Sequence, residues 1–359
     1  MIKLIKPYIS FDEVKDEFQD IFESGWFTKG KFVEEFRDEI KSYTSAKYTY
    51  LTTSATTALT MALKVLDIKA GDEVIISDFS FPATANVVED IGATPIFADV
   101  SLETYNMTAE QLETKITSKT KAVIFVDALG NPSGIHKIKE ICKKHHLPLI
   151  EDGACAIGSS ENSDKCGDIA DITCFSFHPR KLLTTGEGGA ITFNDDSYVD
   201  FFDIKLNHGA KVTDGKFDFV DFGYNYRLSE LQCVMGIKQF QKLDSIVKSR
   251  NIIRNRYIKG LNPLDFKVQN VSNDVVYNVQ SLVFTVPKTI KRDELVIYLK
   301  ENGIETTIGT YCLSATTYYK KKYNDIQQNA QYLEENTITF PCYDGVDIDF
   351  ILNKVKNYK

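Results

Sequence analysis

Short apolar segments alternate with amphipathic segments through the first half of the chain, and this rhythm constrains the fold more than any other feature. The apolar segments are rich in Val, Ile and Phe and show little polar alternation, which is typical of strands covered on both faces. The expected strands are residues 48–52, 73–77, 94–98, 122–126, 147–151, 171–177 and 190–193, and the expected helices include 11–22, 31–43, 56–66, 83–91 and 136–144. This order predicts a mostly parallel sheet with helices on both faces.

The pattern changes in the last third of the chain. Residues 229–255 predict one long helix, and they are followed by predicted strands at 275–286 and 306–308 and predicted helices at 292–301 and 325–335. A chain of 359 residues is also too long for one compact core. We therefore expect an α/β fold with a large domain at residues 1–245 and a smaller C-terminal α+β domain at residues 246–359.

Charge and cysteine usage exclude several classes of protein. The formal net charge is −8, whereas a nucleic-acid-binding protein usually carries a basic face. The seven cysteines form no CxxC pair and the chain has only five histidines, so we expect neither a disulfide framework nor a metal site. The N-terminus does not resemble a signal peptide, and no apolar run is long enough to cross a membrane. We therefore expect a cytoplasmic protein without membrane or nucleic-acid partners.

One lysine, Lys181, lies between a predicted strand and a glycine-rich turn in the segment FHPRKLLTTGEGG (177–189). A lysine that attacks a carbonyl group must lose its proton, and burial near other cations lowers its pKa. The glycines would let the backbone pass close to a ligand. The alternative is a surface lysine before a tight turn.

Two further segments lie at strand ends and offer groups for a charged ligand. Asp152 ends the predicted strand of IEDGAC, where its carboxylate could keep the ring nitrogen of pyridoxal phosphate (PLP) protonated. Residues 53–58 (TSATTA) precede a predicted helix, whose free N–H groups could bind a phosphate, and Ser176 could add another donor. The alternative for both segments is simple helix capping.

Two more segments could contact a ligand. Phe81, just past a strand, could stack on a flat heterocycle or could be an ordinary core residue. Asn225 and Arg227, in GYNYRLSEL, could bind an anion or could be loop and capping residues. No single segment is decisive, but their combination in this order is far more specific.

With these segments the sequence resembles, nearly end to end, the DegT/DnrJ/EryC1/StrS sugar aminotransferases, a group within the fold-type-I PLP enzymes. The similar segments are SGWFTKG (24–30), TSATTAL (53–59), GDEVIISDFSFPATAN (71–86), GATPIFADV (92–100), IEDGACAIGS (150–159), FSFHPRKLLTTGEGGA (175–190) and GYNYRLSELQ (223–232).

The resemblance implies PLP as cofactor, with pyridoxamine 5′-phosphate as the intermediate form. Lys181 would form the Schiff base with PLP and transfer the proton, and Asp152 would pair with the pyridinium nitrogen. The remaining implied cofactor contacts are the phosphate ligands Ser54, Ala55, Thr56 and Ser176, the ring-packing Phe81, Cys155 near the phenolic oxygen, and Asn225 of the neighbouring subunit.

The resemblance also implies substrates and an assembly. L-Glutamate would donate the amino group to a keto sugar, most often a nucleotide-diphosphate-linked 3- or 4-keto-6-deoxysugar, for surface glycan or natural-product synthesis. The active sites would be shared across a homodimer. The residues expected near the substrate are Trp26, Phe27, Thr28, Arg227 and Tyr311.

Three positions depart from the family pattern and bear on the acceptor. Cys155 stands where Gln or His is frequent, Asp127 stands where His is frequent, and residues 309–312 lack a frequent His. A smaller phosphorylated keto compound therefore stays open as the acceptor. A non-catalytic or regulatory PLP-binding role and a PLP-dependent dehydratase also stay open, although the retained Lys181 favours transamination.

Overall fold

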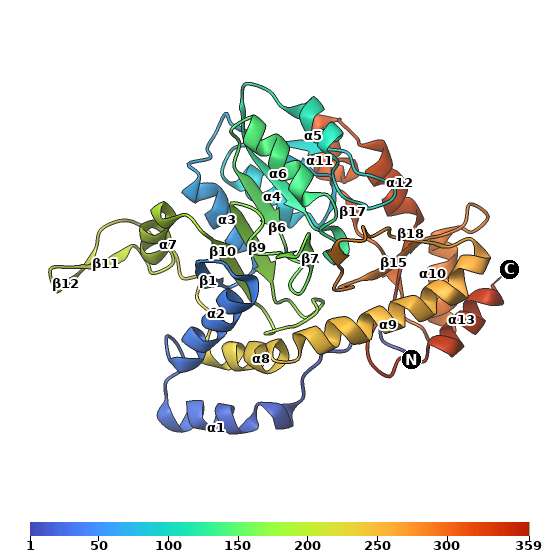
Figure 1. Ribbon diagram of the computed structural model, residues 1–359, viewed down its shortest axis with the longest axis horizontal. Helices are drawn as coiled ribbons and strands as arrows, with labels where there is room; N and C mark the ends of the chain where they lie inside the picture. Colours follow the sequence, from blue (N-terminus) through green and yellow to red (C-terminus); the bar gives the residue numbers. More distant parts are fainter. Residues whose placement is uncertain (359) are drawn as a thin grey trace.

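The computed structural model describes residues 1–358, and its largest element is a seven-stranded sheet in the order β1-β10-β9-β6-β5-β2-β4 (Figure 1). Only β10 runs antiparallel to its neighbours, so the other six strands point the same way. The bounds are β1 Tyr48–Thr52, β2 Glu73–Ser77, β4 Thr94–Ala98, β5 Thr120–Val126, β6 Leu149–Asp152, β9 Ile172–Ser176 and β10 Gly189–Phe193. The predicted mostly parallel sheet is confirmed.

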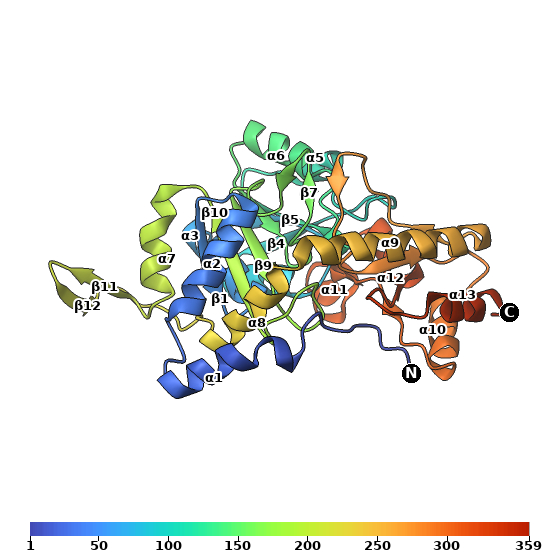
Figure 2. The same cartoon turned by 60° about the horizontal axis from the view of Figure 1, so that its bottom comes forward.

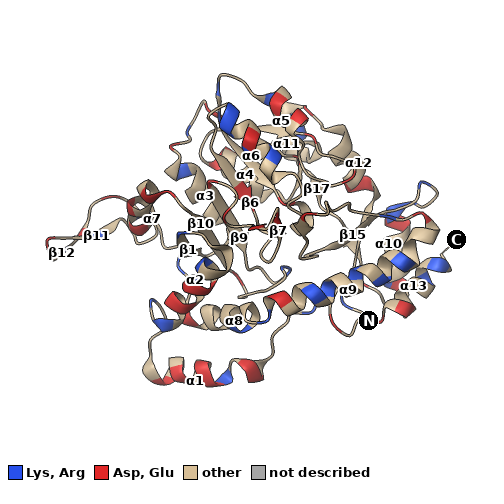
Figure 3. Cartoon of the chain, viewed as in Figure 1, with Lys and Arg blue, Asp and Glu red and all other residues tan. Residues whose placement is uncertain are grey.

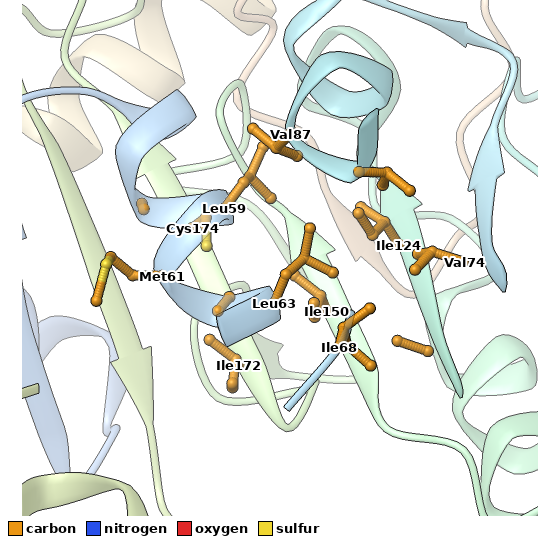
Figure 4. Close-up of a cluster of buried hydrophobic side chains, with 14 of the residues drawn as sticks. Leu59, Met61, Leu63, Ile68, Val74, Val87, Ile124, Ile150, Ile172 and Cys174 are labelled. Carbon is orange, nitrogen blue, oxygen red and sulfur yellow. The ribbon is translucent and has the colours of Figure 1, made fainter. Parts of the chain in front are cut away.

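Helices cover both faces of this sheet, because alternate residues of each strand point to opposite faces. On one face, Ile124, Ile150 and Ile172 pack against Leu59 and Leu63 of α3 (Figure 4). This face is covered by α3 (Ala55–Val65), α4 (Ala83–Asp90) and α7 (Val199–Lys205), and the other face by α2 (Lys31–Thr44), α5 (Ala109–Lys115), α6 (Ile135–Lys144) and α8 (Glu230–Phe240). Each fully buried aliphatic side chain contributes about 1.5–3 kcal/mol to the free energy of folding.

A smaller α+β unit follows, as expected. Its antiparallel sheet has the order β13-β15-β18-β16 and packs against α9, α10 and α13. The bounds are β13 Lys267–Val268, β15 Leu282–Thr285, β16 Thr307–Ile308, β18 Thr337–Phe340, α9 Leu243–Leu261, α10 Arg292–Glu301 and α13 Ile348–Lys356.

Helix α9 runs between the two units (Figures 1 and 2). Its first turns contribute Ile246 and Val247 to the core under the large sheet, and its later turns contribute Ile253 and Tyr257 to the core of the small unit. The cores therefore meet within one helix. The domain boundary after residue 245 stays a prediction.

Two predicted elements are wrong in detail. The single helix expected at 229–255 is broken between α8 and α9, where the Nζ atom of Lys242 is bonded to the Tyr8 carbonyl and the Glu13 carboxylate. The strand expected at 275–286 is also broken into β14 (Val275–Val276) and β15. There Asn278 donates to the carbonyls of Cys155 and Ile157, which draws the chain toward the large domain.

A hairpin of β11 (Ala210–Thr213) and β12 (Lys216–Phe219), which the sequence pattern did not indicate, projects from the large domain (Figures 1 and 2). Apolar side chains on and after it are at least half exposed, namely Val212, Phe217, Phe219, Val220 and Phe222. The remaining elements are α1 (Lys15–Ser24), α11 (Thr317–Tyr323), α12 (Gln328–Asn336), β3 (Phe79–Ser80), β7 (Ser160–Glu161), β8 (Asp164–Lys165) and β17 (Tyr311–Cys312).

The N-terminal segment of the chain contacts the small C-terminal unit. Ile2 forms a parallel bridge with Ile304, and Lys3 pairs with Glu305 at 2.8 Å.

Acidic and basic residues are interspersed along the helices (Figure 3). Within residues 1–358, none of the helices is both long and apolar enough to cross a membrane.

Candidate active site

Several strands of the large sheet end at one edge, and a cavity of about 540 Å³ opens there. Parallel sheets bind ligands at this edge, beyond the carboxyl ends of the strands. The cavity is lined by Asp152 at the end of β6, by Ser176 at the end of β9, and by the first residues of α3. The structure thus brings together groups that the sequence places far apart.

Asp152 lines this cavity and is 6% exposed. Burial raises the pKa of Asp152 above its ordinary value, although Thr84 and the nearby Lys181 act in the opposite direction. The Thr84 hydroxyl donates to Oδ2 at 2.7 Å, and the Ala154 amide donates to Oδ1 at 3.3 Å. No helix begins at Asp152, so the capping alternative does not describe it.

Lys181 enters the same cavity from the loop between β9 and β10. Its side chain is half-buried, and Nζ lies 3.1 Å from Sγ of Cys155. Two glycines shape this loop. Gly186 has a φ of +84°, and a Cβ on Gly189 would lie 2.6 Å from the carbonyl carbon of Ser54, so β10 passes tightly against the start of α3. Lys181 is therefore not a surface lysine.

The start of α3 presents backbone N–H groups to the cavity. Ser54 is the N-cap, and its hydroxyl accepts from the Thr57 amide at 3.1 Å, so the capping alternative is correct for Ser54. The next residues, Ala55 and Thr56, also line the cavity. Unpaired N–H groups and the helix dipole favour an anion here. Capping and anion binding are compatible, because a serine hydroxyl can accept one hydrogen bond and donate another.

Aromatic side chains form the mouth of the cavity. Phe81 is 64% exposed, so it is not a core residue, and its ring meets that of Tyr311 edge-on with centroids 6.2 Å apart. Tyr311 belongs to β17, which pairs with β3 and so carries residues of the C-terminal unit to this edge. A flat ring could stack on Phe81 without displacing any core side chain.

The other expected site residues lie outside this cavity in the same chain. Trp26 lines a separate surface depression beside Glu230, and Phe27 and Thr28 are exposed. Asn225 is exposed and forms a bridge with Asn207, and one Nη atom of Arg227 lies 3.5 Å from Nε2 of His208. The fold of the single chain therefore does not bring these residues to Lys181.

Sequence reasoning missed several lining residues. Thr84 lies within residues 71–86, one of the segments that resemble the family, but nothing in the sequence linked its hydroxyl to Asp152. Arg250 also lines the cavity, is 8% exposed, and donates to the carbonyls of Val279 and Gln280. A signal existed for Arg250, because it occupies the apolar face of a predicted helix, where a charged residue needs buried partners. Lys6 and Tyr8 of the N-terminal segment carried no such signal.

A model of the DegT/DnrJ/EryC1/StrS aminotransferase family matches residues 10–355. The chain belongs to this family. Family membership makes the chain an aminotransferase.

Individual relatives are similar over almost the whole chain. The GDP-perosamine synthase of Vibrio cholerae is 31% identical, with 100% of this chain and 99% of the relative covered. The UDP-4-amino-4,6-dideoxy-N-acetyl-β-L-altrosamine transaminase of Campylobacter jejuni is 31% identical, with 89% and 87% covered. Among solved structures, a putative sugar aminotransferase of Streptococcus pneumoniae in its PMP-form is 27% identical with a TM-score of 0.93, covering 99% of this chain and 98% of its own.

Proposed function

We propose that this chain is a PLP-dependent sugar aminotransferase, which moves an amino group from L-glutamate to a keto sugar linked to a nucleoside diphosphate. The observation that carries the proposal is the single cavity shared by Lys181, the buried Asp152 and the start of α3. The names of the relatives from Vibrio cholerae and Campylobacter jejuni support the class of acceptor. Such a product would serve surface glycan or natural-product synthesis.

The residues of the cavity fit the cofactor. Asp152 would pair with the ring nitrogen, the N–H groups of Ala55 and Thr56 with the hydroxyls of Ser54 and Ser176 would hold the phosphate, and Phe81 would cover the ring. When bound, PLP supplies an electron sink that stabilises negative charge at the carbon bearing the amino group.

The protein's own groups would then handle the proton and the orientation. Lys181 Nζ would remove a proton from the α-carbon of the amino donor and then deliver it to the carbon of the cofactor that takes up the amino group. Removal of the proton requires the neutral amine of Lys181. Cys155 lies against that amine, and Thr84 would hold the Asp152 carboxylate in its ionised, ring-facing orientation. Phe81 and Tyr311 would limit the access of water from the mouth.

A homodimer with shared sites belongs to the same proposal. Asn225 and residues 26–28 lie away from the cavity of their own chain. The β11–β12 hairpin also exposes Phe217 and Phe219. A second copy could cover these apolar side chains and receive Asn225 at its cofactor phosphate. This arrangement supports the expected roles of Trp26, Phe27, Thr28 and Arg227 near the substrate.

Lys181→Ala tests the proposal. We expect the visible absorbance of bound PLP to change and the release of 2-oxoglutarate from glutamate to fall by about 10²–10⁴-fold or more, measured with a panel of keto sugars. Lys115→Ala is the matched control, because Lys115 is half-buried but pairs with Asp325 outside the cavity. Full activity in Lys181→Ala would overturn the assignment.

A further inference from the structure

Three buried titratable side chains meet near the ends of β5 and β6, and none of them lines the cofactor cavity. Asp127 follows β5, Glu151 is in β6 directly before Asp152, and Cys166 follows β8. Asp127 and Glu151 are 0% exposed and Cys166 is 1% exposed. One oxygen or sulfur atom from each lies within 4.8 Å of the others. The mechanism proposed above uses none of the three.

The hydrogen bonds of this cluster are incomplete. Glu151 Oε2 accepts from the Gly167 amide at 3.1 Å and from the Thr173 hydroxyl at 2.6 Å. By contrast, Glu151 Oε1 and both carboxyl oxygens of Asp127 have no donor anywhere in residues 1–358. Buried oxygens without a donor are rare, and each one calls for an explanation. A proton on one of the two carboxyl groups would supply such a donor.

We propose that Asp127 and Glu151 share a single proton at neutral pH, with Asp127 as the neutral acid that donates to Glu151 Oε1. Two ionised carboxylates this close in a buried place would repel each other strongly. One proton removes that repulsion and gives both Glu151 Oε1 and one Asp127 oxygen a partner. Glu151 is the ionised member, because its Oε2 already accepts two hydrogen bonds.

The electrostatics of the surroundings agree with this assignment. Burial raises the pKa of Asp127 well above its ordinary value, and the charge of Glu151 raises it further. Asp152 in β6 and Cys155 in the turn after β6 act on Asp127 in the same direction. Each of these named neighbours therefore favours the neutral acid.

A divalent cation bound by the three side chains would satisfy the same oxygens. The cluster found within residues 1–358 offers three protein donors, whereas a closed structural zinc site takes four. The experiment below separates the two occupants.

The neutral pair lies beside the end of the strand that carries Asp152. The Asp127 amide donates to the Asp152 carbonyl at 3.3 Å, and the Asp127 carbonyl accepts from the Gly130 amide at 2.9 Å. These are backbone bonds, so they place the carboxyl pair next to the end of β6 whatever the side chain at position 127. The shared proton does not rest on the proposed function.

Asp127→Asn tests the proton directly, because an amide can donate to Glu151 Oε1 without taking up a proton. In wild type, Asp127 is ionised in the unfolded chain above about pH 4 and must be protonated on folding. The pKa of Asp127 is higher in the folded protein than in the unfolded chain. Its contribution to the free energy of unfolding is therefore fully present below the unfolded pKa and is lost as the pH rises toward the folded pKa. The wild-type folding equilibrium constant should therefore fall about tenfold per pH unit relative to Asp127→Asn.

The measurement is urea unfolding of both proteins with their bound cofactor, at one protein concentration, from about pH 5 to about pH 7. The ratio compared is the folding equilibrium constant of Asp127→Asn divided by that of wild type. A rise in this ratio of about tenfold per pH unit supports the proposal, and a constant ratio overturns it. Glu230→Gln is the matched control. Glu230 is 2% exposed but accepts from the amides of Gly30, Phe32 and Val33, so the substitution should weaken folding without the tenfold trend.

Two further readouts keep the proposal testable if Asp127→Asn does not fold. Infrared spectra of wild-type protein labelled with ¹³C at its Asp carboxyls should show a protonated acid carbonyl at neutral pH, and its absence would overturn the proposal. Elemental analysis should find no stoichiometric divalent metal. One equivalent of divalent metal bound to the wild-type protein would overturn the shared proton and assign the cluster as a metal site. Neither readout requires turnover, so failure of the proposed function and failure of the shared proton are distinguishable.

Discussion

The side-chain amine of Lys181 lies 3.1 Å from the thiol sulfur of Cys155, and both line the same cavity. Cys155 is the partly exposed cysteine, while the other six in the chain are buried. We expect iodoacetamide to modify Cys155 before the others and bound PLP to slow this reaction, as mapped by peptide mass spectrometry. Equal labelling with and without PLP would contradict the placement of the cofactor beside Cys155.

The same pair leads to a graded effect on activity. Sulfur makes only weak hydrogen bonds, so Cys155→Ala should lower turnover by about tenfold or less, far below the effect of Lys181→Ala. Steady-state assays of both variants under the same conditions measure the difference. A loss in Cys155→Ala as large as that in Lys181→Ala would give the thiol a direct part in the chemistry.

Thr84 should control how Asp152 meets the cofactor. Its hydroxyl donates to Asp152 at 2.7 Å, and this bond opposes the rise in the pKa of Asp152 caused by burial. Thr84→Val keeps the shape but removes the donor, so PLP should bind about 10- to 100-fold more weakly. On acidification, the variant should lose its affinity for PLP at a higher pH than wild type does, because its Asp152 carboxylate is protonated at a higher pH.

Equilibrium dialysis of PLP across pH provides the measurement for Thr84. Thr84→Ser retains the hydroxyl and should bind PLP nearly as wild type does. Unchanged binding in Thr84→Val would show that Asp152 is held by other groups.

The exposed hairpin should govern assembly. Phe217 and Phe219 are 64% and 63% exposed and contact each other edge-on at 5.3 Å. Burial of one Phe stabilises by about 1.5–3 kcal/mol, and Phe217→Ser removes one Phe from each of the two copies, so it should weaken a dimer by about 10²–10⁴-fold. Sedimentation equilibrium measures this change. Phe350→Ser on α13 is the control, and equal dissociation constants for the two variants would rule out the hairpin as the contact.

His136 should make one part of the fold sensitive to pH. Its ring lies 2.8 Å from Glu161 and 3.0 Å from Asp164. Burial lowers the pKa of His136, but the hydrogen bonds to the two carboxylates outweigh it, and the pKa lies above its ordinary value. The stabilisation is therefore full below about pH 6.5 and is lost as pH rises through the raised pKa. Since the ring is partly exposed, we expect about 1 kcal/mol.

Urea unfolding of His136→Gln checks this expectation. The variant should be less stable than wild type at about pH 5.5, and the difference should shrink at about pH 8.5. A difference that grows toward alkaline pH would reverse the assigned sign.

Local pattern was sufficient for the parallel strands and for most helices, because an apolar run or a helical period reports directly on burial. It failed at Lys242, where the expected helix is interrupted and the side chain contacts Tyr8 and Glu13, which lie far away in the sequence. Residues at strand ends, such as Asp152 and Ser176, could be placed at one site because parallel strands end at one edge. The pairing of Asp127 with Glu151 could not, because it depends on how neighbouring strands are aligned.

The N-terminal segment imposes an order on biosynthesis. Leu4, Lys6 and Tyr8 line the cavity, yet Ile2 is held by Ile304 and the opposite wall is built by residues up to Cys342. The wall formed by residues 4–8 can therefore close only after the segment around Ile304 has been synthesised. A chain stalled before that segment would already have the large sheet and Lys181, but its cavity would stay open on one side.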